Sequence, residues 1–429
     1  MPEAASPDAP INPSRLEAMM EKVSTFGGKS NGAMTRLTLS KTDGMARDWL
    51  GGWFREHQFD QQIDPIGNQF GKLSLAGANA PTVMVGSHID SQPNGGRFDG
   101  ALGVISACEA VLAVSERLKA EGRLAACNFQ VVNWTNEEGA RFQPSLLGSS
   151  VFAGSAELEW ALDRKDGDGI TVRRSLAEIG YAGTDKVERP DALIELHIEG
   201  DGKLFAANET FGVFTRFWGA TKYRLAFLGE QAHTGPTPMV QRKDALLAAA
   251  YLMSDLRQLA GEYGLDLHTS VGRLEVFPNS PNTVPSEAVL FIELRSGSPD
   301  VLAQAESKMK EQIELAAKKA GVGYEVRSID RRRAGGFAPG LIALAERVAA
   351  KRGETARHLD TIGGHDAVAM SEVCPSIVMA VRSKDGVIHH PTEYTSPEDH
   401  AAGTQILADM LYALARDGLK VISEEGAAE

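Results

Sequence analysis

The sequence contains little cysteine, no long apolar run and no excess of positive charge. Three of its 429 residues are cysteines, Cys108, Cys127 and Cys374, and their spacing fits neither a metal site nor a redox pair. A sparse, odd set of this kind is typical of a reducing compartment, so we expect a cytoplasmic protein. No apolar segment approaches the roughly 20 residues that cross a bilayer, which argues against a membrane protein.

The net charge of −13 argues against nucleic acid or an anionic membrane as the main partner. It leaves room for an anionic small-molecule substrate, because a site can be locally cationic. The length favours two domains. Residues 1–14 are rich in Pro and Ala and lack the basic and apolar regions of a signal peptide. We therefore expect them to form an unstructured leader.

The first part of the chain alternates predicted strands and helices. Strands are expected at 81–87, 128–134 and 192–198, and an amphipathic helix at 101–119. This order predicts an α/β fold, with an open mixed sheet and helices on both faces. In such sheets, ligands gather beyond the carboxyl ends of the strands.

From about residue 213 the pattern changes. Predicted helices at 244–259 and 299–320 stand among predicted strands at 222–228, 274–278, 287–295 and 323–329. The simplest interpretation is an inserted α+β domain at 213–330, within a catalytic domain made of residues 1–212 and 331–429. The tract Arg331-Arg332-Arg333 would mark the hinge by which the chain returns.

Several segments offer a hard-metal ligand where a strand is predicted to end. They are Gly86–Gly100, which contains His88 and Asp99, the pair Glu137-Glu138, His197, His233 and the turn His389-His390-Pro391. Imidazoles and carboxylates without cysteine suit Zn, Mn, Co or Ni. Two such ions can hold a bridging water, lower its pKa and polarise a carbonyl.

His88 and Asp90 should face the same side of their strand end. We predict His88 as a metal ligand, with Asp90 behind it as the carboxylate that fixes its tautomer. The alternative is a solvated His beside an Asp. Asp99 stands just before the helix at 101–119, where a carboxylate is also favoured as a simple N-cap.

Glu137 and Glu138 follow an apolar strand, and two adjacent acids repel each other. On extended backbone their side chains point in opposite directions. We assign Glu138 as a metal ligand and Glu137 as the general base. A surface pair is the alternative.

The other candidates depend more on context. His197 ends another strand of the same sheet, and His389 competes with His390 for a ligand role. In the inserted domain, His233 could donate a hydrogen bond to an oxyanion, and Arg295 could clamp a substrate carboxylate. His365, in a Gly turn beside Asp366, is expected behind the ligands or on the substrate side.

These motifs together resemble the hydantoinase/carbamoylase amidases, within the wider clan of two-metal aminoacylases and carboxypeptidases. The similarity runs from about residue 80 to 400. It rests on Gly86–Gly100, Asn136–Phe142, Leu196–Glu199, His233–Met239, Gly364–Ala367 and His389–Tyr394.

The resemblance implies two divalent ions held by His88, Asp99 (bridging), Glu138, His197 and His389, with Glu137 as base; it is also the reason for preferring His389 over His390. It implies that Asn282 and Arg295 grip a substrate carboxylate, and that His233 reaches across a homodimer formed through the inserted lid. The expected reaction is hydrolysis of a linear C–N bond in an N-carbamoyl or N-acyl amino acid, through a metal-bridging water.

One departure affects the substrate. Such amidases usually continue His-Ile-Glu with Gln-Gly-Pro, whereas Gly200-Asp201-Gly202 follows here. A dipeptidase or an aromatic amide or amine hydrolase with the same metals is therefore an alternative. A metal-free binding protein is a third hypothesis, disfavoured because every proposed ligand is of a competent type.

Overall fold

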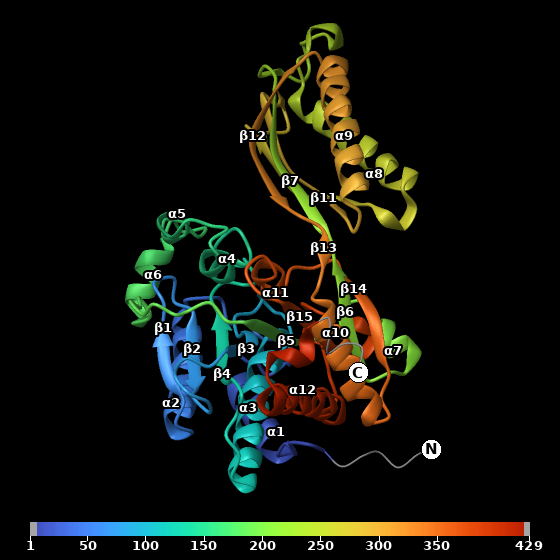
Figure 1. The fold of residues 1–429 in the computed structure, drawn as a ribbon. Helices are drawn as coiled ribbons and strands as arrows, with labels where there is room; N and C mark the ends of the chain where they lie inside the picture. The colour runs from blue at the N-terminus through green and yellow to red at the C-terminus, as the bar shows by residue number, and fades with distance from the viewer. Residues whose placement is uncertain (1–6, 424–429) are drawn as a thin grey trace. The chain divides into compact units, whose positions relative to one another are not determined.

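The computed structural model describes residues 7–423, which divide into two compact units (Figure 1). The large unit comprises the chain up to Thr215, Phe337–Leu359 and the residues from Gly364 onward. The inserted unit comprises Arg216–Gly336 and Asp360–Gly363.

The large unit is built on a mixed sheet. Among the described residues the strand order is β1-β2-β4-β3-β5-β15-β6-β13, with β14 paired to β6. Their bounds are β1 Asp60–Ile63, β2 Gln69–Leu73, β3 Thr82–His88, β4 Asn128–Trp134, β5 Ala192–Ile198, β6 Phe211–Phe217, β13 Gly335–Gly336, β14 Ala356–Thr361 and β15 Ser376–Val381. The neighbours β4, β3, β5 and β15 are parallel, so their carboxyl ends share one edge. The expected open mixed α/β sheet is confirmed.

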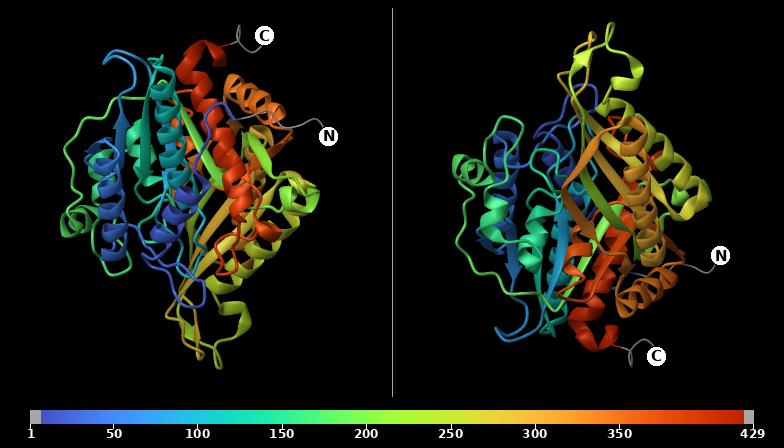
Figure 2. Two further views of the ribbon diagram at one scale, coloured as in Figure 1. Left: turned by 90° about the horizontal axis from the view of Figure 1, so that it is seen from below. Right: turned by 90° about the horizontal axis from the view of Figure 1, so that it is seen from above.

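Helices cover both faces of this sheet (Figures 1 and 2). One face carries α1 (Pro13–Ser24), α2 (Lys41–Glu56), α3 (Ala101–Glu121), α10 (Pro339–Lys351) and α12 (Pro397–Asp417), which share a single apolar core with the strands. The other carries α4 (Leu147–Ala153) and α11 (Asp366–Met370), which contact each other. The short helices α5 (Leu158–Leu162), α6 (Val172–Ile179) and α7 (Lys203–Ala207) complete the unit. Strands β4 and β5 are buried at every position, which explains their continuous apolar runs.

The inserted unit is an antiparallel sheet with two helices. Its strand order is β12-β7-β11-β9, with bounds β7 Gly219–Leu228, β9 His268–Phe277, β11 Glu287–Ser296 and β12 Gly323–Arg332. Helices α8 (Ala245–Glu262) and α9 (Pro299–Ala320) bury their apolar side chains against one face, and a short ladder pairs β8 (Ala232–His233) with β10 (Thr283–Val284). Because β12 continues through Arg332, the hinge interpretation was wrong for Arg331 and Arg332.

The N-terminal segment is only partly described, and its described part contradicts the leader prediction. The N–H of Ala9 donates to Asp409 Oδ1 at 3.0 Å, and Gln405 Nε2 donates to the carbonyl of Ala9 at 2.8 Å. Ala9 is fully buried, and α1 begins at Pro13. Residues 1–6 lie outside the described part. Between residues 7 and 423, no helix has both the length and the apolarity needed to span a membrane.

Candidate metal centre

The topology of the sheet explains how distant residues meet. His88 is the last residue of β3, His197 is the next to last of β5, and Glu137 follows closely after β4. Because these strands are parallel, their ends deliver the side chains to one edge. The structure brings together His88, Asp99, Glu137, Glu138, His197 and His389.

Asp99 lies at the centre of this cluster, and its two oxygens face different partners. Oδ1 is 3.1 Å from His197 Nε2 and 3.8 Å from His88 Nε2. Oδ2 is 3.0 Å from His389 Nε2, which in turn is 3.2 Å from Glu138 Oε2. Two groups of possible ligands, His88–Asp99–His197 and Asp99–Glu138–His389, therefore share one carboxylate. The alternative of a plain N-cap role for Asp99 is excluded, because Gly100 occupies the N-cap of α3 and no side chain caps this helix.

These distances fit divalent cations. Two ligand atoms bound to a tetrahedral ion at about 2.1 Å lie about 3.4 Å apart, close to the separations found here. His88 Nε2 is buried without a hydrogen-bond partner in the described chain, and Asp99 Oδ2 lies near His389 without an aligned hydrogen bond. Buried polar atoms are normally paired, so a cation would satisfy atoms that the protein alone leaves unsatisfied.

The electrostatics of the cluster also favour a cation. The close carboxylates of Asp99 and then Glu138 raise the pKa of His389 to about 11. Burial acts to raise the pKa of Asp99, but the imidazoles of His197 and His389 outweigh burial and hold this pKa well below its usual range. The acids therefore draw positive charge onto the imidazoles, and a divalent ion can replace those protons.

The two adjacent glutamates have different surroundings. Glu138 Oε2 accepts from Gln92 Nε2 at 2.9 Å and faces His389. Glu137 Oε2 lies 3.5 Å from His88 Nε2. Burial raises the pKa of Glu137 well above its usual range, and the charge of His88 opposes that shift.

Asp90 supports this arrangement through the backbone. Its Oδ1 accepts from the N–H of Glu137 at 3.3 Å, and its Oδ2 from that of Glu138 at 3.4 Å. His88 Nδ1 is 2.9 Å from the carbonyl of Asp90 and 3.5 Å from its carboxylate. The carbonyl is thus the nearer acceptor for fixing the tautomer of His88, and the carboxylate orients the glutamate turn.

The structure distinguishes His389 from His390 by their contacts. His389 has a φ of 58° and turns toward Asp99. Both residues are exposed, but the Nδ1 of His390 lies 2.8 Å from Thr392 Oγ1 instead. His389 is thus the member of the pair inside the cluster.

Two buried acids near the centre were missed by the sequence reasoning. Glu195 accepts from Ser87 Oγ at 2.7 Å and from the N–H of Ala367 at 2.9 Å. Glu393 Oε1 accepts from the N–H groups of Phe98 and Asp99, at 2.8 and 3.0 Å. A charged residue inside the apolar run of β5 was a usable signal for Glu195. The loop position of Glu393 gave none.

His365 lies behind His197, with ring centroids 4.6 Å apart. Together with Glu195 these histidines form another group whose ligand atoms lie close enough to hold an ion. The His365 side chain is 10% exposed.

The remaining candidates belong to the inserted unit. His233 and Asn282 are exposed and adjacent, because the N–H of Thr234 donates to the carbonyl of Asn282 at 3.1 Å. Arg295 donates through Nη1 to the carbonyl of Ile362 at 2.6 Å and pairs with Glu293 at 3.0 Å. These three residues are thus not among those that the large unit brings together.

Comparisons with known proteins identify the family. The profile of Peptidase family M20/M25/M40 matches residues 84–413. The N-carbamoyl-L-amino-acid amidohydrolase of Rhizobium meliloti is 33% identical over 399 residues, covering 92% of this chain and 95% of the relative. That of Geobacillus stearothermophilus is 31% identical over 420 residues, covering 95% and 99%.

A solved structure shares the whole fold. It is an amidase of the hydantoinase/carbamoylase family from Burkholderia vietnamiensis, 33% identical, with a TM-score of 0.89 over 96% of this chain and 100% of that one. The resemblance read from the motifs is confirmed. The chain therefore belongs to Peptidase family M20/M25/M40 and, within it, to the hydantoinase/carbamoylase amidases.

Proposed function

We propose that this protein is a two-metal amidohydrolase that cleaves a linear C–N bond of an N-carbamoyl or N-acyl amino acid. The observation that carries the proposal is the division of the Asp99 oxygens between two groups of ligands. His88 and His197 would hold one ion with Asp99, and Glu138 and His389 the other. As a member of its family the chain is a metal-dependent amidohydrolase that acts on C–N bonds other than peptide bonds. Zn, Mn, Co and Ni all suit these ligands.

Glu137 is the group that moves the proton. When bound, the ions supply Lewis acidity toward a carbonyl oxygen and lower the pKa of water. Glu137 is buried beside His88 but is not needed as a ligand, so it is available to take a proton from the attacking water. It then delivers that proton to the leaving nitrogen.

The inserted unit would supply contacts to the rest of the substrate. A guanidinium has five N–H donors, and Arg295 uses Nη1 for Ile362 and Nη2 for Glu293. Its remaining donors could bind a substrate carboxylate. Asn282 lies beyond the opposite end of β11 from Arg295, about 26 Å away or more at about 3.3 Å per strand residue, so the expected joint grip within one protomer is not formed, and an Asn282 contact would have to come from a second copy of the chain. His233 would donate to the oxyanion, and His365 would contact the substrate from the large unit.

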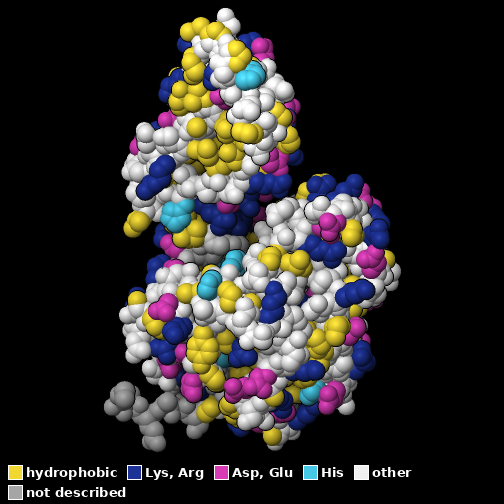
Figure 3. All heavy atoms as spheres, turned by 180° about the vertical axis from the view of Figure 1, so that it is seen from behind, with side chains coloured by type: hydrophobic (Ala, Val, Ile, Leu, Met, Phe, Trp, Pro, Cys, Tyr) yellow, Lys and Arg dark blue, Asp and Glu magenta, His cyan; other side chains and the backbone are white. Residues whose placement is uncertain are grey.

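We also propose a homodimer formed through the inserted unit, which would act as a lid. Its helices cover one face of its sheet, and Phe277, Tyr324, Val326 and Ile329 are exposed on the outer strands. Figure 3 shows hydrophobic side chains at the surface among charged ones. Light scattering during gel filtration measures the mass, and a monomer would refute this proposal. Three free, buried cysteines are consistent with a cytoplasmic location.

The experiment that tests the reaction compares wild type with Glu137→Gln. The variant should lose about 10²–10⁴-fold in turnover, the range for a lost general acid–base group, while metal content stays unchanged. Metal is measured by mass spectrometry of protein purified without chelator. Full activity in the variant would remove Glu137 from the mechanism.

A substrate panel tests the bond that is cleaved. Protein from which a chelator has removed the metal is reloaded with Mn, Zn, Co or Ni. The rate of hydrolysis is then measured for N-carbamoyl, N-acyl, N-formyl and dipeptide compounds. The names of the relatives favour the carbamoyl compounds, and preference for dipeptides would favour the alternative instead.

A further inference from the structure

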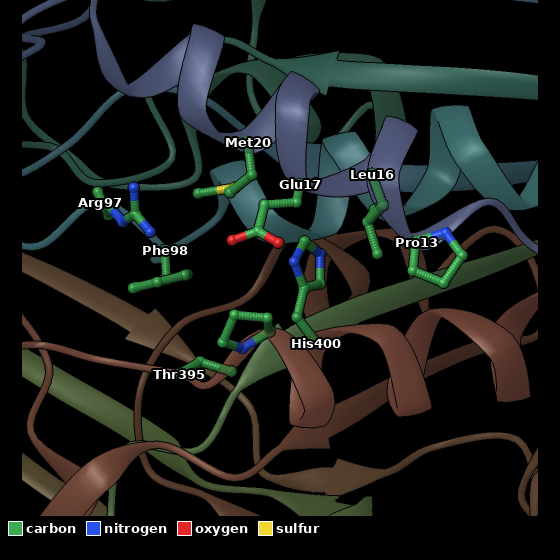
Figure 4. A pocket seen from close by; sticks show the side chains of 9 residues that line it. Pro13, Leu16, Glu17, Met20, Arg97, Phe98, Thr395 and His400 are labelled. Atoms are coloured by element: carbon green, nitrogen blue, oxygen red, sulfur yellow. The ribbon is translucent and has the colours of Figure 1, made fainter.

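A small cavity lies beside the loop that carries Asp99 (Figure 4). Its walls come from α1, from Arg97 and Phe98, and from the start of α12 with the preceding Thr395. Its volume is about 50 Å³, which is room for a few water molecules or one small polar molecule. Much of the lining is apolar, from Pro13, Leu16, Met20, Phe98 and Pro397. None of the lining residues is a candidate metal ligand.

Three polar side chains at this cavity make no hydrogen bond or ion pair in the part of the chain that the structure describes. Thr395 Oγ1 is buried without a hydrogen bond, and the residue is 1% exposed. Arg97 makes no hydrogen bond or ion pair among residues 7–423, and its guanidinium lies 4.7 Å from the centroid of the Phe98 ring. Glu17 is an exposed residue, and its carboxylate also makes no hydrogen bond or ion pair within these residues. In Figure 4, Glu17 and His400 lie between Arg97 and Pro13.

We propose that this cavity binds a small zwitterion, a molecule with one carboxylate and one ammonium group, such as an α-amino acid. Arg97 and the Thr395 hydroxyl would donate to the carboxylate, and Glu17 would accept from the ammonium group. Charge-assisted hydrogen bonds of this kind are the strong ones in proteins. The apolar lining would take a short side chain. That the natural ligand is the amino-acid product rests on the proposed function.

His400 supports the assignment of the charges. Its Nε2 lies 2.9 Å from Ser106 Oγ, and burial, followed by the charge of Arg97, lowers the pKa of this imidazole to about 3. His400 is thus neutral at physiological pH, and Arg97 is the cation that lines the cavity. One cation and one anion suit a zwitterion better than a simple anion.

The cavity is connected to the metal centre by Glu393. Its carboxylate accepts from the N–H groups of Phe98 and Asp99, and Thr395 follows two residues later. A ligand that joins Arg97 to Thr395 therefore contacts the two segments that Glu393 already holds together, directly beside Asp99.

Equilibrium dialysis of labelled glycine against the full-length, metal-loaded protein tests the proposal. Glycine should bind at least about tenfold more tightly than acetate or methylammonium, because each of these lacks one charge-assisted contact. Arg97→Gln, Glu17→Gln and Thr395→Val should each weaken binding by at least about fivefold, the order expected for one lost contact. Glu21→Gln, an exposed acid on the same helix, should have no effect. Thr395→Val replaces a hydroxyl that has no partner, so it should fold.

A second variant separates this site from the metal centre. His389→Ala disrupts the candidate ligand cluster and should still bind glycine. The proposal is overturned by the absence of saturable binding, by equal affinity for acetate, or by binding that survives Arg97→Gln and Thr395→Val but is lost in His389→Ala. Loss of hydrolysis with glycine binding intact would instead count against the proposed function alone.

Discussion

Gly100→Ala should damage the metal centre from a position that carries no ligand atom. A Cβ at Gly100 would lie 2.3 Å from Cε1 and Nε2 of His88, whereas ordinary contacts begin at 3.4 Å. The imidazole must therefore shift by about 1 Å, and ligand distances in metal sites tolerate only about 0.2 Å. Gly100 also has a φ of +65° and a ψ of −49°, outside the αL region, so an alanine there costs more than the about 1–2 kcal/mol of αL. We expect metal affinity to fall at least 10–100-fold, the range for disturbed ligand orientation.

Gly122→Ala is the matched control at the other end of the same helix. Gly122 has a φ of +62°, yet a Cβ there meets no atom within 4 Å. This variant should lose about 1–2 kcal/mol of stability, the cost of αL for an alanine, and keep its metal. Metal content and thermal unfolding are measured on both variants after identical purification. If Gly100→Ala retains the full metal content of Gly122→Ala, a Cβ at position 100 does not displace His88 and the reasoning is refuted.

Four further substitutions test other parts of the structure. His389→Ala should lose metal and activity while His390→Ala keeps most of both, and equal loss would reject this distinction. His400 has a folded pKa near 3 against 6.5 in its ordinary state, so between these values the unfolded chain binds one more proton. The free energy of unfolding therefore falls with falling pH by up to about 1.4 kcal/mol per unit. His400→Asn should reduce this slope between about pH 4 and 6 in denaturant titrations, and an unchanged slope would contradict the assignment. Gly200→Gln should fold normally, because a Cβ there meets only Ile388 methyl groups at 3.5 and 3.8 Å. It should raise kcat/KM for carbamoyl substrates relative to acyl substrates. An unchanged ratio would show that residue 200 does not determine substrate specificity.

The strands and the convergence at their ends could be predicted from sequence because parallel strands are buried on both faces. Such strands appear as continuous apolar runs, and each is followed at the same edge by a loop. The sequence alone is thus sufficient to place His88, Glu138 and His197 near one another. The contacts of Asp90 could not, because its carboxylate bonds to backbone N–H groups 47 and 48 residues away.

Other parts depended on tertiary contacts without a local signal. The N-terminal segment looks unstructured by composition, but Ala9 is bonded to Asp409, 400 residues further on. Glu393 resembles any loop acid in sequence. Glu393 stabilises the fold because its carboxylate accepts hydrogen bonds from two N–H groups of the Asp99 loop.

The position of Asp99 in both candidate ligand groups has a consequence for metal uptake by the proposed two-metal centre. In the proposed two-metal centre one carboxylate would serve both positions, so an ion on one side would withdraw negative charge from the other while fixing the geometry that the other needs. The binding of the two proposed ions would then not be independent. Stepwise removal by a chelator should expose this interdependence as a departure from two equal, unlinked dissociation constants.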